Sequence, residues 1–175
     1  TLEGEGSDRL PYRFPKGLGL PGVQNELLQA ISEVGKPTTI IIVAGSAVPV
    51  VVTHESLLYA LYPGIETGNA VAQILLGIQS PSGKLPFSIP HSIEQLPPYT
   101  DYHMSTYPGR TFQWYTMYKQ NPYLYEFGYG LSYTTFCYSQ MTIHYNQSQS
   151  LSAMVTIRNT GQRVGNEIVQ LYSTW

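Results

Sequence analysis

Residues 21–45 read PGVQNELLQAISEVGKPTTIIIVAG, and this stretch decides the expected fold. Its first half repeats apolar residues at helical spacing, and the Gly35–Pro37 turn then ends the helix. The next run, Thr38–Ala44, is short, continuous and β-branched, which is typical of a strand buried on both faces. The apolar helix face consists of Val23, Leu27, Leu28, Ile31 and Val34.

Two more apolar runs follow, Val48–Thr53 and Leu57–Tyr62, and we expect a strand in each. The pattern of Glu66–Leu76 then predicts a second helix, which Gly77 closes. A helix, three strands and a helix in that order indicate part of an α/β layer fold. The inward positions predicted for the second helix are Ala70, Val71, Ile74 and Leu75.

From Ser132 onward the sequence favours strands joined by short polar turns. Alternation predicts strands over 141–145, 153–157 and 167–171, with a turn at Asn159–Gly161. This pattern indicates the start of a β-sandwich, and because a complete one needs about seven strands, we expect an open edge and a mobile tail.

Composition excludes several classes of function. Charged residues make up 11% of the 175 residues and the net charge is −2, which does not suit a nucleic-acid-binding surface. The longest apolar run, Ile40–Ala44, is too short to span a membrane. Cys137 is the single cysteine, so no disulfide within the chain and no multi-cysteine metal site is expected. Because the chain starts at Thr1 rather than Met, we expect a piece of a longer protein.

The acidic segment Glu3–Arg9 carries the strongest candidate for chemistry. Glu3 and Glu5 are separated and followed by glycines, which let the backbone approach a ligand closely. A glutamate of raised pKa can donate a proton. A solvated acidic loop is the commoner use of such a segment, and the residues alone leave both readings open.

Other polar motifs carry less information. The four histidines share no metal-ligand spacing, and Ser46 lacks the second glycine of a nucleophile turn. The tyrosine-rich stretch 99–133 could stack on sugars or nucleobases, although packing is the more frequent use of aromatic residues. Asn146 begins an Asn-Gln-Ser glycosylation sequon, which mildly favours secretion. We therefore expect an extracellular, secretory or lysosomal location.

Several short motifs occur in a fixed order along nearly the whole chain. They are Glu3–Arg9, Leu20–Gln24, Tyr62–Gly64, Ser80–Pro86, Pro108–Phe112, Phe127–Phe136, Asn159–Gly161 and Gly165–Tyr172. Each motif is weak alone, but their order is specific. Together they resemble the family-3 glycoside hydrolases, most closely the β-xylosidase and β-glucosidase branch.

The resemblance implies an architecture of a barrel-like domain, an α/β sandwich and a fibronectin type III-like domain. We therefore expect a partial α/β sandwich over 1–97 and a connecting segment over 98–131. A truncated fibronectin type III-like β-sandwich should follow over 132–175. The partner implied for these parts is an N-terminal barrel domain of the same polypeptide.

The resemblance also implies an activity, the retaining hydrolysis of terminal β-linked sugars in oligosaccharides or aryl and alkyl β-glycosides. The family nucleophile is an Asp of the first domain, and nothing in this chain matches it. The general acid/base Glu precedes an Asp-Arg pair, so Glu3 is the first choice and Glu5 the second. No metal or organic cofactor is implied. Arg110, Cys137 and the 128–136 segment are expected to hold domains together rather than contact sugar.

Two departures from the family pattern bear on these expectations. The segment 49–62 is shorter than the family usually shows, so a crossover or strand could be missing. Thr67-Gly68 stands where Gly-Gly is usual, which is a milder change. A second reading stays open, in which the chain is a non-catalytic carbohydrate-binding or structural module. The fragment alone is expected to be inactive.

Overall fold

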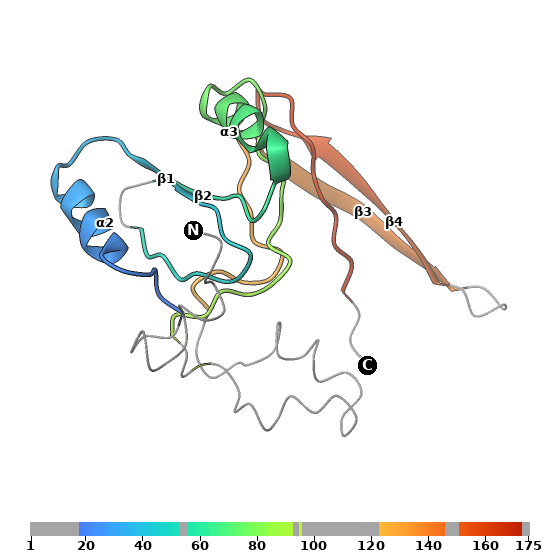
Figure 1. Cartoon of the computed structure of the whole chain (residues 1–175). Helices are drawn as coiled ribbons and strands as arrows, with labels where there is room; N and C mark the ends of the chain where they lie inside the picture. Colours follow the sequence, from blue (N-terminus) through green and yellow to red (C-terminus); the bar gives the residue numbers. More distant parts are fainter. Residues whose placement is uncertain (1–17, 53–55, 93–94, 96–122, 146–150, 173–175) are drawn as a thin grey trace. The chain divides into compact units, whose positions relative to one another are not determined.

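The computed structural model describes residues 18–52, 56–92, 95, 123–145 and 151–172. The chain divides into two compact units, which Figure 1 draws in one view without fixing their relative placement. The first unit comprises residues 1–67 and 85–129, and the second comprises residues 68–84 and 130–175. Each unit is described below by itself.

The first unit begins with α2, Gln24–Glu33, which confirms the first predicted helix. Gly35 ends it in the left-handed conformation, with φ of +67°, and its N–H donates to Ser32 O. α2 contains no buried residue, and of the residues on its predicted apolar face only Leu28 packs against the core.

Strands β1, Thr39–Ile42, and β2, Ser56–Tyr59, pair in parallel, with Ile42 opposite Tyr59. Both strands confirm predicted runs. The expectation of burial on both faces is wrong, since Ile42 is buried while Ile41 and Val43 are exposed. On the same face as Ile41, its partner Leu58 is half-buried, so this face is partly covered among the described residues.

The core of the first unit lies in the loop after β1. Val48 and Val50 are buried with Ile42 and Ala44, so the run predicted as a strand at Val48–Thr53 instead forms a core loop over its described residues, 48–52. Pro49 explains the difference, because it has no N–H to give to a ladder. The Tyr59 hydroxyl accepts from Val48 N at 2.8 Å and donates to Val48 O, which fastens the loop to β2.

A second pairing in the first unit joins segment 85–89 to segment 124–129. Leu85 N donates to Tyr129 O at 2.9 Å, and Ile89 N donates to Tyr125 O at 2.7 Å. Ile89 forms an isolated antiparallel bridge with Tyr125 and is fully buried. The main chain of the 124–129 segment is thereby fixed against 85–89.

The second unit contains most of α3, Thr67–Leu75, which follows the 3-10 turn Gly64–Glu66. The helix and its closure at Gly77 are confirmed, since Gly77 N donates to Ile74 O and Gly77 has φ of +69°. The predicted inward face is wrong for Ala70 and Leu75, which are exposed. Val71 and Ile74 are half-buried, so the helix contacts its unit through a narrower stripe than predicted.

Strands β3, Phe136–Tyr145, and β4, Leu151–Asn159, form an antiparallel pair, the long ribbon in Figure 1. Both extend beyond the predicted spans. The third predicted strand, 167–171, is wrong, because the described residues from 164 to 172 form no strand. The predicted turn at Asn159–Gly161 is confirmed by a hydrogen bond from Gly161 N to Asn159 Oδ1 at 3.0 Å.

The β3–β4 pair contains a β-bulge. Ser139 is opposite Thr156 and Thr142 is opposite Met154, so two residues of β3 oppose Val155. One of them, Gln140, has φ of +53°. Beyond the bulge the alternation of β3 shifts by one residue, which puts the following side chains on one face of the ribbon. They are Phe136, Tyr138, Ile143 and Tyr145 from β3 and Leu151, Ala153, Val155 and Ile157 from β4, and we call this set the apolar face.

The mixture of helices and strands confirms the α/β class in its coarse form. The fibronectin type III-like assignment and the domain boundaries stay predictions. No helix among the described residues is long and apolar enough to cross a membrane.

Candidate functional site

The residues chosen for catalysis, Glu3 and Glu5, lie outside the described residues, as does the sequon at Asn146. Of the histidines, His91 and His144 are described, and the described part of the chain contains no group of three His, Cys, Asp or Glu side chains that could hold a metal. Cys137 is a free, exposed thiol. The functional argument within the described residues therefore rests on the motif segments that meet in the second unit.

Two of the motif segments meet through Ser80 and Ser132. Their hydroxyl oxygens are 2.9 Å apart, and Tyr133 N donates to Ser80 Oγ at 3.0 Å. Ser80 is buried, so its hydroxyl exchanges water for these two partners. The contact fixes the start of the 130–136 segment against the segment that follows α3.

A third motif joins at Thr134, which is buried. Thr134 Oγ1 donates to Asn159 Oδ1 at 2.7 Å, and Asn159 Nδ2 donates to Arg163 O at 2.8 Å. A Cβ on Gly161 would lie 2.2 Å from Thr134 Oγ1, so only glycine fits this approach. The Asn159–Gly161 motif thus holds the end of β4 against Thr134, just before β3. Its role here is structural.

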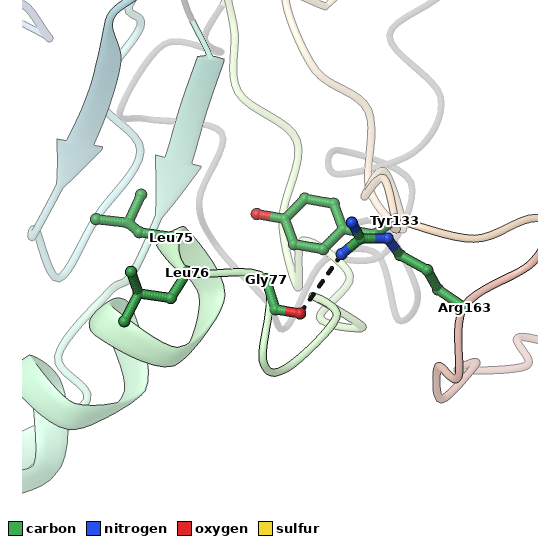
Figure 2. A pocket seen from close by; sticks show the side chains of 5 residues that line it. All are labelled: Leu75, Leu76, Gly77, Tyr133 and Arg163. Carbon is green, nitrogen blue, oxygen red and sulfur yellow. Dashed lines mark hydrogen bonds between the residues drawn. The ribbon is translucent and has the colours of Figure 1, made fainter.

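The end of α3 forms an open hollow of about 400 Å³, lined by Leu75, Leu76, Gly77, Tyr133 and Arg163. Figure 2 shows the Arg163 guanidinium beside the Tyr133 ring, with a dashed hydrogen bond to the Gly77 carbonyl. Arg163 Nη1 donates to Gly77 O at 3.4 Å, and its central carbon is 5.8 Å from the Tyr133 ring centroid. Tyr133 OH donates to Ile74 O at 3.0 Å.

This arrangement places the Tyr133 hydroxyl on a carbonyl of the last turn of α3 and the Arg163 cation on the carbonyl of the closing glycine just beyond it, where both stabilise the helix end. Its lining includes no carboxyl group and therefore no candidate acid/base for glycoside cleavage. Sequence reasoning included Tyr133 in the 128–136 segment, which it expected to hold domains together, and it missed Arg163; the closing glycine at 77 was the other signal that pointed to this place.

The tyrosine-rich stretch can be tested where it is described. The rings of Tyr125 and Tyr129 lie 5.4 Å apart between centroids at an angle of 33°, a packing contact. Burial raises the pKa of the Tyr125 phenol above its ordinary value, and the nearby Tyr129 adds to the shift. At these two residues the stretch serves packing.

Comparison with protein families gives a match to the glycosyl hydrolase family 3 C-terminal domain over residues 1–133. The match includes the acidic segment with Glu3 and Glu5 and extends to the segment that contains Tyr133.

Curated relatives extend the likeness to nearly the whole chain. A β-glucosidase of Bacteroides ovatus is 40% identical over 96% of this chain and 24% of its own length. A xylan 1,4-β-xylosidase of Xylanibacter ruminicola is 36% identical over 98% of this chain and 19% of its own length. The chain therefore spans about a fifth to a quarter of the length of these relatives.

Among solved structures, a β-glucosidase from Streptomyces venezuelae in complex with D-glucose matches 85% of this chain and 20% of its own. The TM-score is 0.68 and the sequence identity 31%. The comparison of folds and the comparison of sequences therefore both find β-glucosidases among the proteins similar to this chain.

Proposed function

The chain belongs to glycosyl hydrolase family 3, and from that premise we propose that it is part of a retaining, exo-acting β-glycosidase to which it contributes the general acid/base. The order of motifs supports this proposal, because the Glu-x-Glu segment before Asp8-Arg9 lies at the beginning of the matched span. Glu3 is the proposed acid/base, with Glu5 as the second choice.

The chemistry requires two carboxyl groups. In a retaining mechanism one attacks the anomeric carbon, and the other protonates the leaving oxygen and then activates water, at a separation of about 5–5.5 Å. This chain offers a candidate for the second group only. We therefore propose that the nucleophile Asp belongs to a barrel domain elsewhere in a longer polypeptide, and that docking of the domains sets the distance between the two carboxyls.

The substrate class follows from the relatives. The curated relatives include a β-glucosidase and a xylan 1,4-β-xylosidase. We propose a terminal β-linked glucose or xylose as the sugar removed, from an oligosaccharide or an aryl or alkyl β-glycoside.

The β3–β4 ribbon is proposed to begin the fibronectin type III-like domain. In a β-sandwich, the apolar face of one sheet packs on a second sheet about 10 Å away. The ribbon has such a face, and its members Tyr145, Leu151 and Ile143 are 71%, 57% and 56% exposed. Further strands that cover this face would complete the sandwich.

The decisive experiment replaces Glu3 by Ala in a full-length protein that contains this chain. Loss of general acid catalysis should slow cleavage of glycosides with poor leaving groups by about 10²–10⁴-fold. Activated aryl glycosides should be slowed less in the glycosylation step, and azide should partly restore turnover by replacing the activated water.

Two further variants make this result specific. Glu26→Ala, on the exposed surface of α2, is the matched control and should leave kcat unchanged. If Glu5→Ala gives the acid/base pattern and Glu3→Ala does not, the second choice is correct. If neither variant shows it, the acid/base lies outside this segment and the proposed role is wrong.

The rival reading, a non-catalytic carbohydrate-binding or structural module, is favoured by one observation. Among the described residues of the second unit, the motif segments make hydrogen bonds within the protein: Ser80 with Ser132, and Asn159 with Thr134 and Arg163. Turnover of the full-length protein that depends on Glu3 would exclude this reading. Sugar binding without any turnover would support it.

A further inference from the structure

Lys84 is the meeting point of three motif segments in the second unit. Its Nζ donates to Gly130 O at 2.8 Å and lies 3.6 Å from Glu167 Oε1. The side chains of Lys84 and Glu167 are 17% and 13% exposed, so the pair is largely removed from water. Tyr138 OH donates to the same Glu167 oxygen at 2.7 Å. One carboxylate is thus held from two separate parts of the chain.

Glu167 belongs to segment 164–172, which has no strand partner among the described residues. The segment nevertheless lies close to the beginning of β3. A Cβ on Gly165 would meet Thr134 Cγ2 at 2.9 Å and Phe136 Cζ at 3.5 Å. Because Phe136 and Tyr138 both belong to the apolar face, residues 165–167 pass over the first part of that face.

Hydrophobic burial holds this segment only weakly. Its apolar side chains Ile168 and Val169 are 46% and 47% exposed. A displacement of the segment would move Glu167 away from Lys84 and Tyr138, leaving a largely buried ammonium without its counter-charge.

We propose that Lys84 is a positioning residue that holds segment 164–172 in place in the second unit, by holding Glu167 while it binds the carbonyl of Gly130. Selecting one arrangement of the chain is the best-attested use of a buried charged group. This role is independent of the proposed glycosidase activity, since it uses none of the carboxyl groups assigned to catalysis.

The test is limited proteolysis read by mass spectrometry on the full chain, with Lys84→Met, Glu167→Gln and the double variant. Cleavage within 164–172 should be at least about tenfold faster in each single variant, while cleavage within β4 keeps its rate. The double variant should add little to either single one, because the two residues act through one contact. Lys84→Arg keeps the cation and should restore most of the protection.

A second readout reports the contact itself. The hydrogen bond to Glu167 is the main cause that raises the pKa of the Tyr138 phenol, followed by burial and the Glu167 charge. In Glu167→Gln, the ultraviolet titration should therefore show one tyrosine ionising at lower pH, and Tyr138→Phe identifies that tyrosine by removing it. A purely global loss of stability would leave this pKa in the folded protein unchanged.

The matched control is Lys36→Met, an exposed lysine of the first unit, which should change neither readout. Unchanged cleavage within 164–172 in Lys84→Met would overturn the proposal, because other contacts would then hold the segment. Equal acceleration in 164–172 and in β4 would also overturn it, since the pair would then stabilise the unit as a whole. An unshifted tyrosine titration in Glu167→Gln would show that the contact does not form.

Discussion

Gly130 is the position where one added methyl group should do most damage. Its Cβ would lie 2.2 Å from Gly83 O and 3.2 Å from Lys84 Cδ. The first neighbour is main chain and cannot rotate away, so the two segments must separate. Overpacking of this kind costs about 1–3 kcal/mol. We expect Gly130→Ala to fall at about 2–3 kcal/mol, because the separation also lengthens the 2.8 Å hydrogen bond from Lys84 Nζ to Gly130 O.

The assay is thermal unfolding followed by circular dichroism. For a chain of this size, about 1 kcal/mol changes Tm by about 2–4 °C, so Gly130→Ala should lower Tm by about 4–12 °C. Gly83→Ala and Gly68→Ala are the matched controls, because a Cβ at either position meets nothing within 4 Å. Gly68→Ala lies inside α3 and should raise stability by about 0.5–1 kcal/mol. If the Tm of Gly130→Ala equals that of these controls, the segments of Gly83 and Gly130 do not approach each other as closely as the structure shows.

Two further predictions concern backbone conformation and pH. Gln140→Gly should stabilise the protein by about 0.5–1 kcal/mol, because Gln140 has φ of +53°, a conformation that glycine adopts without strain. Gln140→Ala should give no such gain. Equal Tm values for the two variants would contradict this prediction. Burial raises the pKa of Tyr125, so its neutral form is favoured in the folded state. The stability that this contributes is complete below the ordinary pKa of 10.0 and is lost as pH rises through the raised value. Urea unfolding at alkaline pH should show this loss in the parent chain and less of it in Tyr125→Phe, and identical pH profiles would refute the assignment.

Local patterns were enough to predict both helices and strand β1. The apolar spacing and the closing glycines at 35 and 77 predicted α2 and α3, and the β-branched run predicted β1. These signals act over a few residues, so a single sequence contains them in full. Burial was predicted less well, because it depends on which distant segment covers each face.

The contacts between motifs could not be predicted from the sequence alone. Ser80 meets Ser132, and Lys84 meets Glu167, across long stretches of chain whose path no local pattern gives. Gly161 and Gly130 could be recognised as motif members, but not as places where a side chain would strike a neighbouring segment. The proposed acid/base at Glu3 came from the order of motifs and stays a prediction.

The spans of β3 and β4 show a further limit of pattern reading. The predicted strand at 141–145 stopped where the alternation of apolar residues changed phase, whereas β3 begins at Phe136. Alternation assumes a constant period of two, and the bulge at Gln140 breaks that period inside one strand. The parts of β3 before and after the bulge have opposite alternation, so the sequence pattern predicted a strand only for the second part.

Because of this bulge, the number of residues in β3 decides which face of the ribbon the side chains after Gln140 occupy. Its extra residue restores the phase, so that Phe136 and Tyr138 before it share a face with Ile143 and Tyr145 after it. Removing that residue would turn Ile143 and Tyr145 to the side that now carries Thr142 and His144, without changing the identity of any remaining residue. In this hairpin an insertion or deletion before Ile143 therefore changes the faces of more side chains than the exchange of a single amino acid does.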